Sequence, residues 1–87
     1  MKTMNEALVI LQEECAEVSQ IISKIHRFGP ESKPPTSNDM NIDILHKEVG
    51  DMLCMVKICV EKDILNIDKL EKYILEKDEK LKIWSNL

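Results

Sequence analysis

The spacing of apolar residues most constrains what this chain can fold into. Apolar side chains recur at intervals of three and four, which places them on one face of an α-helix. Two segments each carry a purely apolar stripe and a neighbouring stripe that contains carboxylates, called here the apolar and acidic stripes. The apolar stripes are Leu8, Leu11, Cys15, Val18, Ile22 and Ile25, and Ile42, Leu45, Val49, Met52, Val56 and Cys59. The acidic stripes are Ala7, Ile10, Glu14, Glu17 and Ile21, and Ile44, Glu48, Asp51, Met55 and Ile58.

Signals for helix ends divide the chain into three helices. Thr3, with Glu6 three residues later, predicts the start of a first helix that runs to about Phe28 and stops at Gly29-Pro30. A second helix is expected to start near Asn38 to Asn41, both good capping residues, and to continue to about Lys62. Asn66 predicts the cap of a third helix over 67–84. Residues 29–38 form a Pro-rich loop, either a plain connector or a flap over a site.

The expected fold is therefore all-α: a single domain over residues 1–87, with the first two helices antiparallel in a small bundle of about three helices. A core of this size is marginal. Because the chain is 44% hydrophobic and carries two stripes on each of two helices, we expect oligomerisation to complete the bundle, with the acidic stripes buried between chains or around a site. A compact monomeric bundle with some exposed apolar surface is the alternative. Gly50, inside the second helix, indicates either close approach by a helix or ligand or a glycine that is simply tolerated there.

Charge and composition exclude several kinds of partner. The net charge is −4 and there are only one Phe, one Tyr and one Trp, so the chain lacks the basic, aromatic surface typical of nucleic-acid binding. No apolar run approaches membrane-spanning length. Cys15, Cys54 and Cys59 form no metal-binding motif and are expected to be buried free thiols, which favours a cytoplasmic location.

The acidic stripes carry the chemistry. Glu14 and Glu17, and likewise Glu48 and Asp51, are three residues apart and so lie about one turn apart on a helix face. Carboxylates inside an apolar stripe are costly unless protons or a cation compensate them. In an antiparallel pair the four can converge, and an all-oxygen set suits Mg²⁺, with Mn²⁺ possible. A carboxylate-held Mg²⁺ commonly binds substrate phosphates as well, which predicts phosphoryl or nucleotidyl transfer to water.

Glu13 lies next to this set on the predicted helix. It is about 100° around the axis from Glu14. It is either the residue that orients or deprotonates the attacking water or an ordinary solvated glutamate.

The motif Glu13-Glu14-x-x-Glu17, followed by Glu48-x-x-Asp51, resembles the paired acidic motif of MazG-type nucleoside triphosphate pyrophosphohydrolases. The resemblance spans roughly residues 6–84 and includes Ser23-Lys24-Ile25-His26-Arg27-Phe28-Gly29, as in small phage and bacterial MazG-like proteins. It implies an all-α domain in which Glu14, Glu17, Glu48 and Asp51 bind Mg²⁺. It also implies cleavage of a nucleoside triphosphate between the α and β phosphates, with Glu13, Glu14 and Glu48 catalytic, in a homodimer or homotetramer with sites at the subunit interface.

The chain departs from this pattern at two places. The connector between the two motifs is slightly longer than usual, and Asp78 stands where the family often has Asn. Lys77 and Lys80 remain candidates for binding substrate phosphate near the C-terminus, and Lys24 and Arg27 at the other end of the site. For each of these four, a solvated basic residue is an equally good interpretation.

Three functions remain open on the sequence. The main hypothesis is a broad nucleoside triphosphate pyrophosphohydrolase, or one narrowed to dUTP or dCTP. The second is a helical oligomerisation or partner-binding module, in which the acidic pairs form ion pairs with lysines of a neighbouring subunit. The third is a nucleotide sensor without turnover. Binding of Mg²⁺ or Mn²⁺ that stabilises the fold would separate the first from the second.

Overall fold

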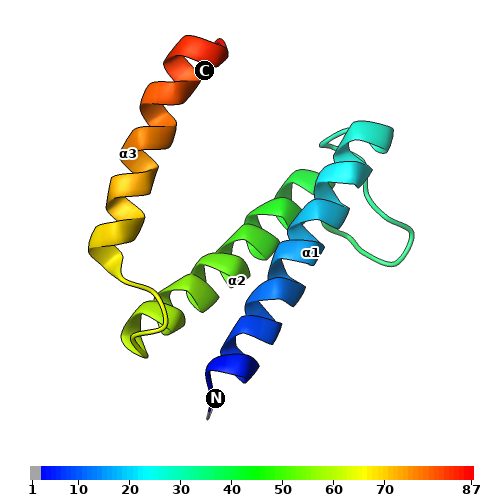
Figure 1. The fold of residues 1–87 in the computed structure, drawn as a ribbon. Helices are drawn as coiled ribbons and strands as arrows, with labels where there is room; N and C mark the ends of the chain where they lie inside the picture. Colours follow the sequence, from blue (N-terminus) through cyan, green and yellow to red (C-terminus); the bar gives the residue numbers. More distant parts are fainter. Residues whose placement is uncertain (1–2) are drawn as a thin grey trace.

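The computed structural model describes residues 3–87 and contains three helices, α1 (Met4–Phe28), α2 (Asn41–Glu61) and α3 (Ile67–Trp84). Within the described residues there is no strand, and no helix is long and apolar enough to cross a membrane. The all-α class and the three predicted helices are therefore confirmed. Figure 1 shows α1 and α2 as an antiparallel hairpin, with α3 standing apart from it.

Local capping explains where the helices begin and end. The Thr3 hydroxyl accepts a hydrogen bond from the backbone N–H of Glu6 at 3.1 Å, and the Asn66 side chain accepts one from Lys69 N–H at 3.1 Å. Gly29 ends α1 with φ +92°, a conformation that favours glycine. The cap predicted for α2 was wrong: Met40 occupies that position without a side-chain bond, and Asn41 is the first helical residue.

The hairpin core lies between α1 and α2, which pack along their lengths. Its buried apolar residues are Ala7, Ile21, Met55 and Cys59, and all but Cys59 belong to the acidic stripes. The acidic stripes thus face each other within one chain, around the carboxylates. Along α1 the apolar stripe is turned outward, where Leu8 and Ile22 are exposed. The expectation that Cys15 is buried was wrong for this reason, and Cys54 is exposed too.

Helix α3 has no comparable packing against the hairpin. None of its residues is buried, and large apolar side chains such as Ile74, Leu75 and Trp84 are more than half exposed. The Cα radius of gyration is 15.7 Å, whereas a compact chain of this length has about 12 Å. The single chain is therefore an open structure, consistent with a bundle that other copies complete.

Gly50 lies on the exposed side of α2. A Cβ atom added there would meet nothing within 4 Å. Within one chain, the expected close approach of a helix at Gly50 is therefore not observed.

Candidate metal and nucleotide site

Three of the four predicted carboxylates meet between the paired helices. One oxygen each from Glu14 and Glu17 on α1 and Glu48 on α2 lies within 4.8 Å of the other two. Glu14 and Glu48 are half-buried and Glu17 is exposed. The antiparallel pairing of the two acidic stripes produces this juxtaposition, and the three residues are called here the acidic cluster.

The acidic cluster contains two oxygens whose environment is unfavourable. Among the residues that the structure describes, Glu14 Oε2 and Glu48 Oε2 are buried and have no hydrogen-bond partner. A buried acceptor without a partner loses the hydrogen bonds that water would give it, and a negative charge increases the penalty. These oxygens therefore favour the arrival of a proton or a cation.

Electrostatic repulsion within the cluster also affects Glu17. A hydrogen bond with Glu48 and then the negative charges of Glu48 and Glu14 raise the pKa of the Glu17 carboxyl above its ordinary value of 4.5. The nearby Lys47 opposes this increase in pKa. The repulsion between these carboxylates therefore favours the protonated form of Glu17.

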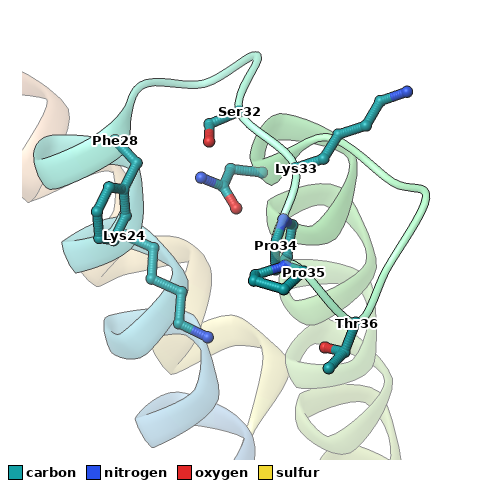
Figure 2. A pocket seen from close by; sticks show the side chains of 8 residues that line it. Lys24, Phe28, Ser32, Lys33, Pro34, Pro35 and Thr36 are labelled. Carbon is teal, nitrogen blue, oxygen red and sulfur yellow. The ribbon is translucent and has the colours of Figure 1, made fainter.

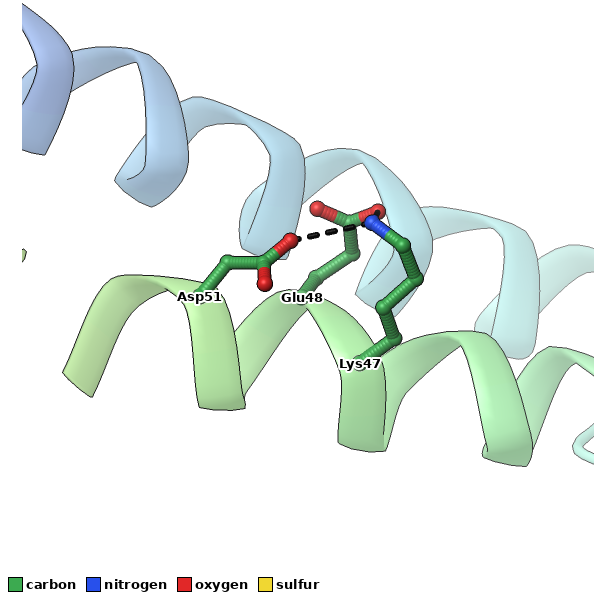
Figure 3. A network of polar contacts seen from close by, with 3 residues as sticks. All are labelled: Lys47, Glu48 and Asp51. Carbon is green, nitrogen blue, oxygen red and sulfur yellow. Dashed lines mark hydrogen bonds and ion pairs between the residues drawn. The ribbon is translucent and has the colours of Figure 1, made fainter. Parts of the chain in front are cut away.

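Asp51, the fourth predicted ligand, has a different partner. Its Oδ2 accepts a hydrogen bond from Lys47 Nζ at 2.9 Å, and the same ammonium lies 3.5 Å from Glu48 Oε1 (Figure 3). This pairing with Asp51 raises the pKa of Lys47. Lys47 was not among the predicted site residues, although its position four residues before Asp51 is a readable signal for an ion pair on a helix.

A cavity of about 350 Å³ opens beside the acidic cluster. Its lining includes Glu17 and Glu48 together with the ammonium-bearing Lys24 and Lys47 and the amide of Gln20. The predicted phosphate-binding residue Lys24 thus lies next to the acidic cluster. This combination of carboxylates and cations can hold a metal ion together with an anionic group.

The remaining predicted site residues lie outside the acidic cluster. Glu13 is exposed on α1, and the Arg27 guanidinium lies 5.0 Å from the centre of the Phe28 ring. Lys77 and Lys80 are exposed on α3, which stands away from the hairpin, so one chain does not bring them to the carboxylates.

Comparisons with known proteins assign no relative to this chain. No protein-family model matches it, and neither a search of curated proteins nor a search of solved structures finds a match.

Proposed function

We propose that the protein hydrolyses nucleoside triphosphates to the monophosphate and pyrophosphate with the help of a divalent cation. The observation that carries the proposal is the acidic cluster, where two buried carboxylate oxygens without partners lie beside a cavity with lysines on its rim. The resemblance to MazG-type pyrophosphohydrolases supplies the reaction and the cleavage between the α and β phosphates.

The donor set fits Mg²⁺ or Mn²⁺. Glu14, Glu17 and Glu48 offer oxygen ligands alone, which hard cations prefer. Asp51 would join them if its bond to Lys47 were exchanged for the metal. The cation would offset phosphate charge and activate a water.

The chain's own residues supply the remaining functions. Lys24 and Lys47 place positive charge on the cavity beside the carboxylates, where it attracts the triphosphate and fixes its position. Lys47 also holds Asp51 in place. The role of Glu13 in orienting the attacking water stays a prediction, which Glu13→Gln tests through kcat at unchanged metal affinity.

A further part of the proposal is a homo-oligomer, a dimer or a tetramer. The chain exposes 7046 Å², whereas a compact monomer of its mass exposes about 5,300 Å². The excess is roughly twice the 800 Å² that each partner of a standard interface buries. The outward apolar stripe of α1 and the apolar side chains of α3 account for much of this surface. Lys77 and Lys80 would then reach the acidic cluster of another copy rather than their own.

The oligomer has a direct test. Light scattering coupled to size exclusion measures its mass, and Ile74→Glu on α3 is expected to reduce the mass to that of a monomer. Lys72→Glu, on the opposite face of α3, is the matched control and should leave the mass unchanged. A monomeric wild-type protein would contradict this part of the proposal.

The reaction is tested by measuring pyrophosphate release from a panel of NTPs and dNTPs with Mg²⁺, with Mn²⁺ and with EDTA. Metal-dependent release that is lost in Glu48→Gln is expected. The panel also decides between broad use and a preference for dUTP or dCTP. No release from any nucleotide by folded, metal-loaded protein would refute the reaction and favour a sensor. The cytoplasmic location belongs to the same proposal, supported by three free thiols.

An oligomerisation or partner-binding module is the second candidate. One observation favours it: Asp51 and Glu48 already form ion pairs without a metal, with Lys47 of the same helix rather than with a lysine of a neighbouring subunit. Ion pairs with lysine do not require a metal ion, so Mg²⁺ would not stabilise such a protein.

A further inference from the structure

A second cavity lies at the end of the hairpin, beyond the acidic cluster. It has a volume of about 420 Å³ and is lined mainly by apolar surface of the α1 end and of the loop that follows it. Figure 2 shows Phe28 and Lys24 on α1 facing Pro34, Pro35 and Thr36 across this space, while the Lys33 ammonium points away from it. The volume lies within the range of about 300–1,000 Å³ that is typical of small-molecule sites.

Hydrogen bonds from the start of α2 fix the first part of the loop, residues 29–32. Asn41 is only 2% exposed, and its side-chain amide donates to the Gly29 carbonyl at 3.1 Å. Its backbone N–H donates to the Ser32 carbonyl at 2.8 Å, and the next residue, Ile42, donates to Pro30 at 2.8 Å. The first turn of α2 thus holds residues 29–32 at the start of the loop, so this edge of the cavity is formed before any ligand arrives.

Phe28 is the only aromatic residue among residues 3–61, which include both helices of the hairpin. It is 60% exposed, although burial in the hairpin would stabilise it. The Arg27 guanidinium lies 5.0 Å from the ring centre and adds positive charge beside it. An exposed aromatic ring next to proline surfaces is suited to contact a flat, partly apolar group.

Lys24 connects this cavity with the acidic cluster, because it lines both cavities. A ligand that spans them therefore meets carboxylates, then an ammonium, then an aromatic ring and two prolines. The matching molecule has a metal-bound anionic end, a further anionic group and a flat, largely apolar end. A nucleoside triphosphate has these parts in this order.

We propose that the cavity between Phe28 and the 32–36 loop is the nucleoside subsite, with the base against Phe28 and the phosphate nearest the sugar on Lys24. This inference rests on the proposed function. Since every base has a π face, stacking on Phe28 does not select among bases. The subsite therefore implies broad use of nucleotides rather than a restriction to dUTP or dCTP. The hydroxyls of Ser32 and Thr36 on the loop are available to the sugar or the base edge.

The test compares nucleotides with inorganic tripolyphosphate, which has the phosphates but no base. Phe28→Ala is expected to raise KM for ATP, CTP and dUTP by about 5- to 150-fold, the loss measured when an aromatic that stacks on a base is removed. Inhibition by tripolyphosphate and kcat should change little. Phe28→Tyr keeps the ring and should restore the wild-type KM, and Lys62→Ala, an exposed lysine at the opposite end of α2, is the control.

Several results would overturn the subsite. Unchanged nucleotide KM in Phe28→Ala does so, as does an equal loss of tripolyphosphate inhibition, which would indicate a general disturbance. A Phe28→Tyr variant as impaired as Phe28→Ala also argues against stacking. A strong preference for one base in the wild-type protein would refute the broad specificity.

A binding measurement separates this inference from the proposed reaction. AMP and UMP are titrated in EDTA, and amide chemical shifts are followed by NMR. Shifts centred on Phe28, Ser32 and Thr36 that vanish in Phe28→Ala support the subsite even if no nucleotide is hydrolysed, in which case only the reaction fails. Turnover without such shifts, and without a KM effect in Phe28→Ala, refutes the subsite and leaves the reaction standing.

Discussion

Glu48→Gln is expected to stabilise the metal-free protein while abolishing its response to metal. Glu48 lies at the centre of the acidic cluster, with its Oε2 buried and its side chain 14% exposed. The substitution keeps the shape of the side chain and removes one negative charge. It also introduces an amide N–H that can donate to Glu14 Oε2, an oxygen that has no hydrogen-bond partner in the wild-type protein.

The magnitude follows from Coulomb's law. One carboxylate oxygen of Glu14 and one of Glu48 lie within 4.8 Å of each other. Their repulsion is therefore about 1 kcal/mol at the dielectric constant of water and about 3.5 kcal/mol at an effective value of 20. The substitution also removes the ion pair between Glu48 and Lys47, whose nitrogen lies 3.5 Å from the carboxylate and whose side chain is 67% exposed. Losing such an exposed pair costs about 0–1 kcal/mol of stability. The net gain in the free energy of unfolding is therefore between about 0 and 3.5 kcal/mol, and each 1 kcal/mol of gain raises Tm by at least about 4 °C.

The assay is urea unfolding at one fixed protein concentration, followed by circular dichroism in EDTA and again with Mg²⁺ or Mn²⁺. The wild-type midpoint should rise with metal, because a ligand that binds only the folded state stabilises it. Glu48→Gln should begin higher in EDTA and rise much less. Glu61→Gln is the matched control: it is an exposed glutamate of the same helix, paired with Lys57 at 3.7 Å. Its free energy of unfolding should stay within about 0.5 kcal/mol of the wild-type value.

Two results would refute this reasoning. A Glu48→Gln variant that is less stable than wild type in EDTA would mean that the ion pair of Glu48 is net favourable. The oligomerisation or partner-binding module requires this. A variant with the full wild-type response to metal would mean that the cation binds elsewhere.

Three further outcomes are expected. Because the pKa of Glu17 is raised in the folded protein, its contribution to stability is fully present below pH 4.5 and is lost as the pH rises through the raised pKa. Thermal melts in EDTA between pH 4 and 8 should show Tm falling in this way, and Glu17→Gln should make Tm less dependent on pH. Asn41→Ala removes the side-chain donor to the part-buried Gly29 carbonyl and should cost about 0.5–1.5 kcal/mol in urea unfolding, the net value of one hydrogen bond, whereas an equally stable variant would show that this bond does not hold the loop. Gly50→Ala meets open space and should add about 1 kcal/mol, so a loss of stability would reveal a neighbouring copy packed on that face.

The helices were predictable because their signals are local. Thr3, Gly29 and Asn66 act through hydrogen bonds or backbone angles within one turn, and the structure shows each at the helix end that the sequence predicted. The α2 cap failed because Asn41 has a long-range partner: its amide binds Gly29, twelve positions earlier. No local pattern distinguishes an Asn that caps its own helix from one that anchors a distant loop.

The acidic cluster was predictable in part for a similar reason. Helical spacing and antiparallel pairing suffice to bring Glu14, Glu17 and Glu48 together. The position of Asp51 depends on competition between the cluster and Lys47, which spacing alone does not resolve. The α3 lysines depend on where a whole helix packs, and one chain leaves that packing open.

The arrangement of the stripes links the candidate site to the proposed oligomer. The hairpin buries its acidic stripes inside and leaves the apolar stripe of α1 largely outside, although the opposite choice would bury more apolar area and no carboxylates. A small domain that places unpartnered carboxylate oxygens in its core gives up stability that its size scarcely allows. Cation binding would restore part of that stability, and burial of the outward stripe and of α3 between copies would restore more. On this reasoning, metal binding and oligomerisation stabilise the same fold and should each strengthen the other.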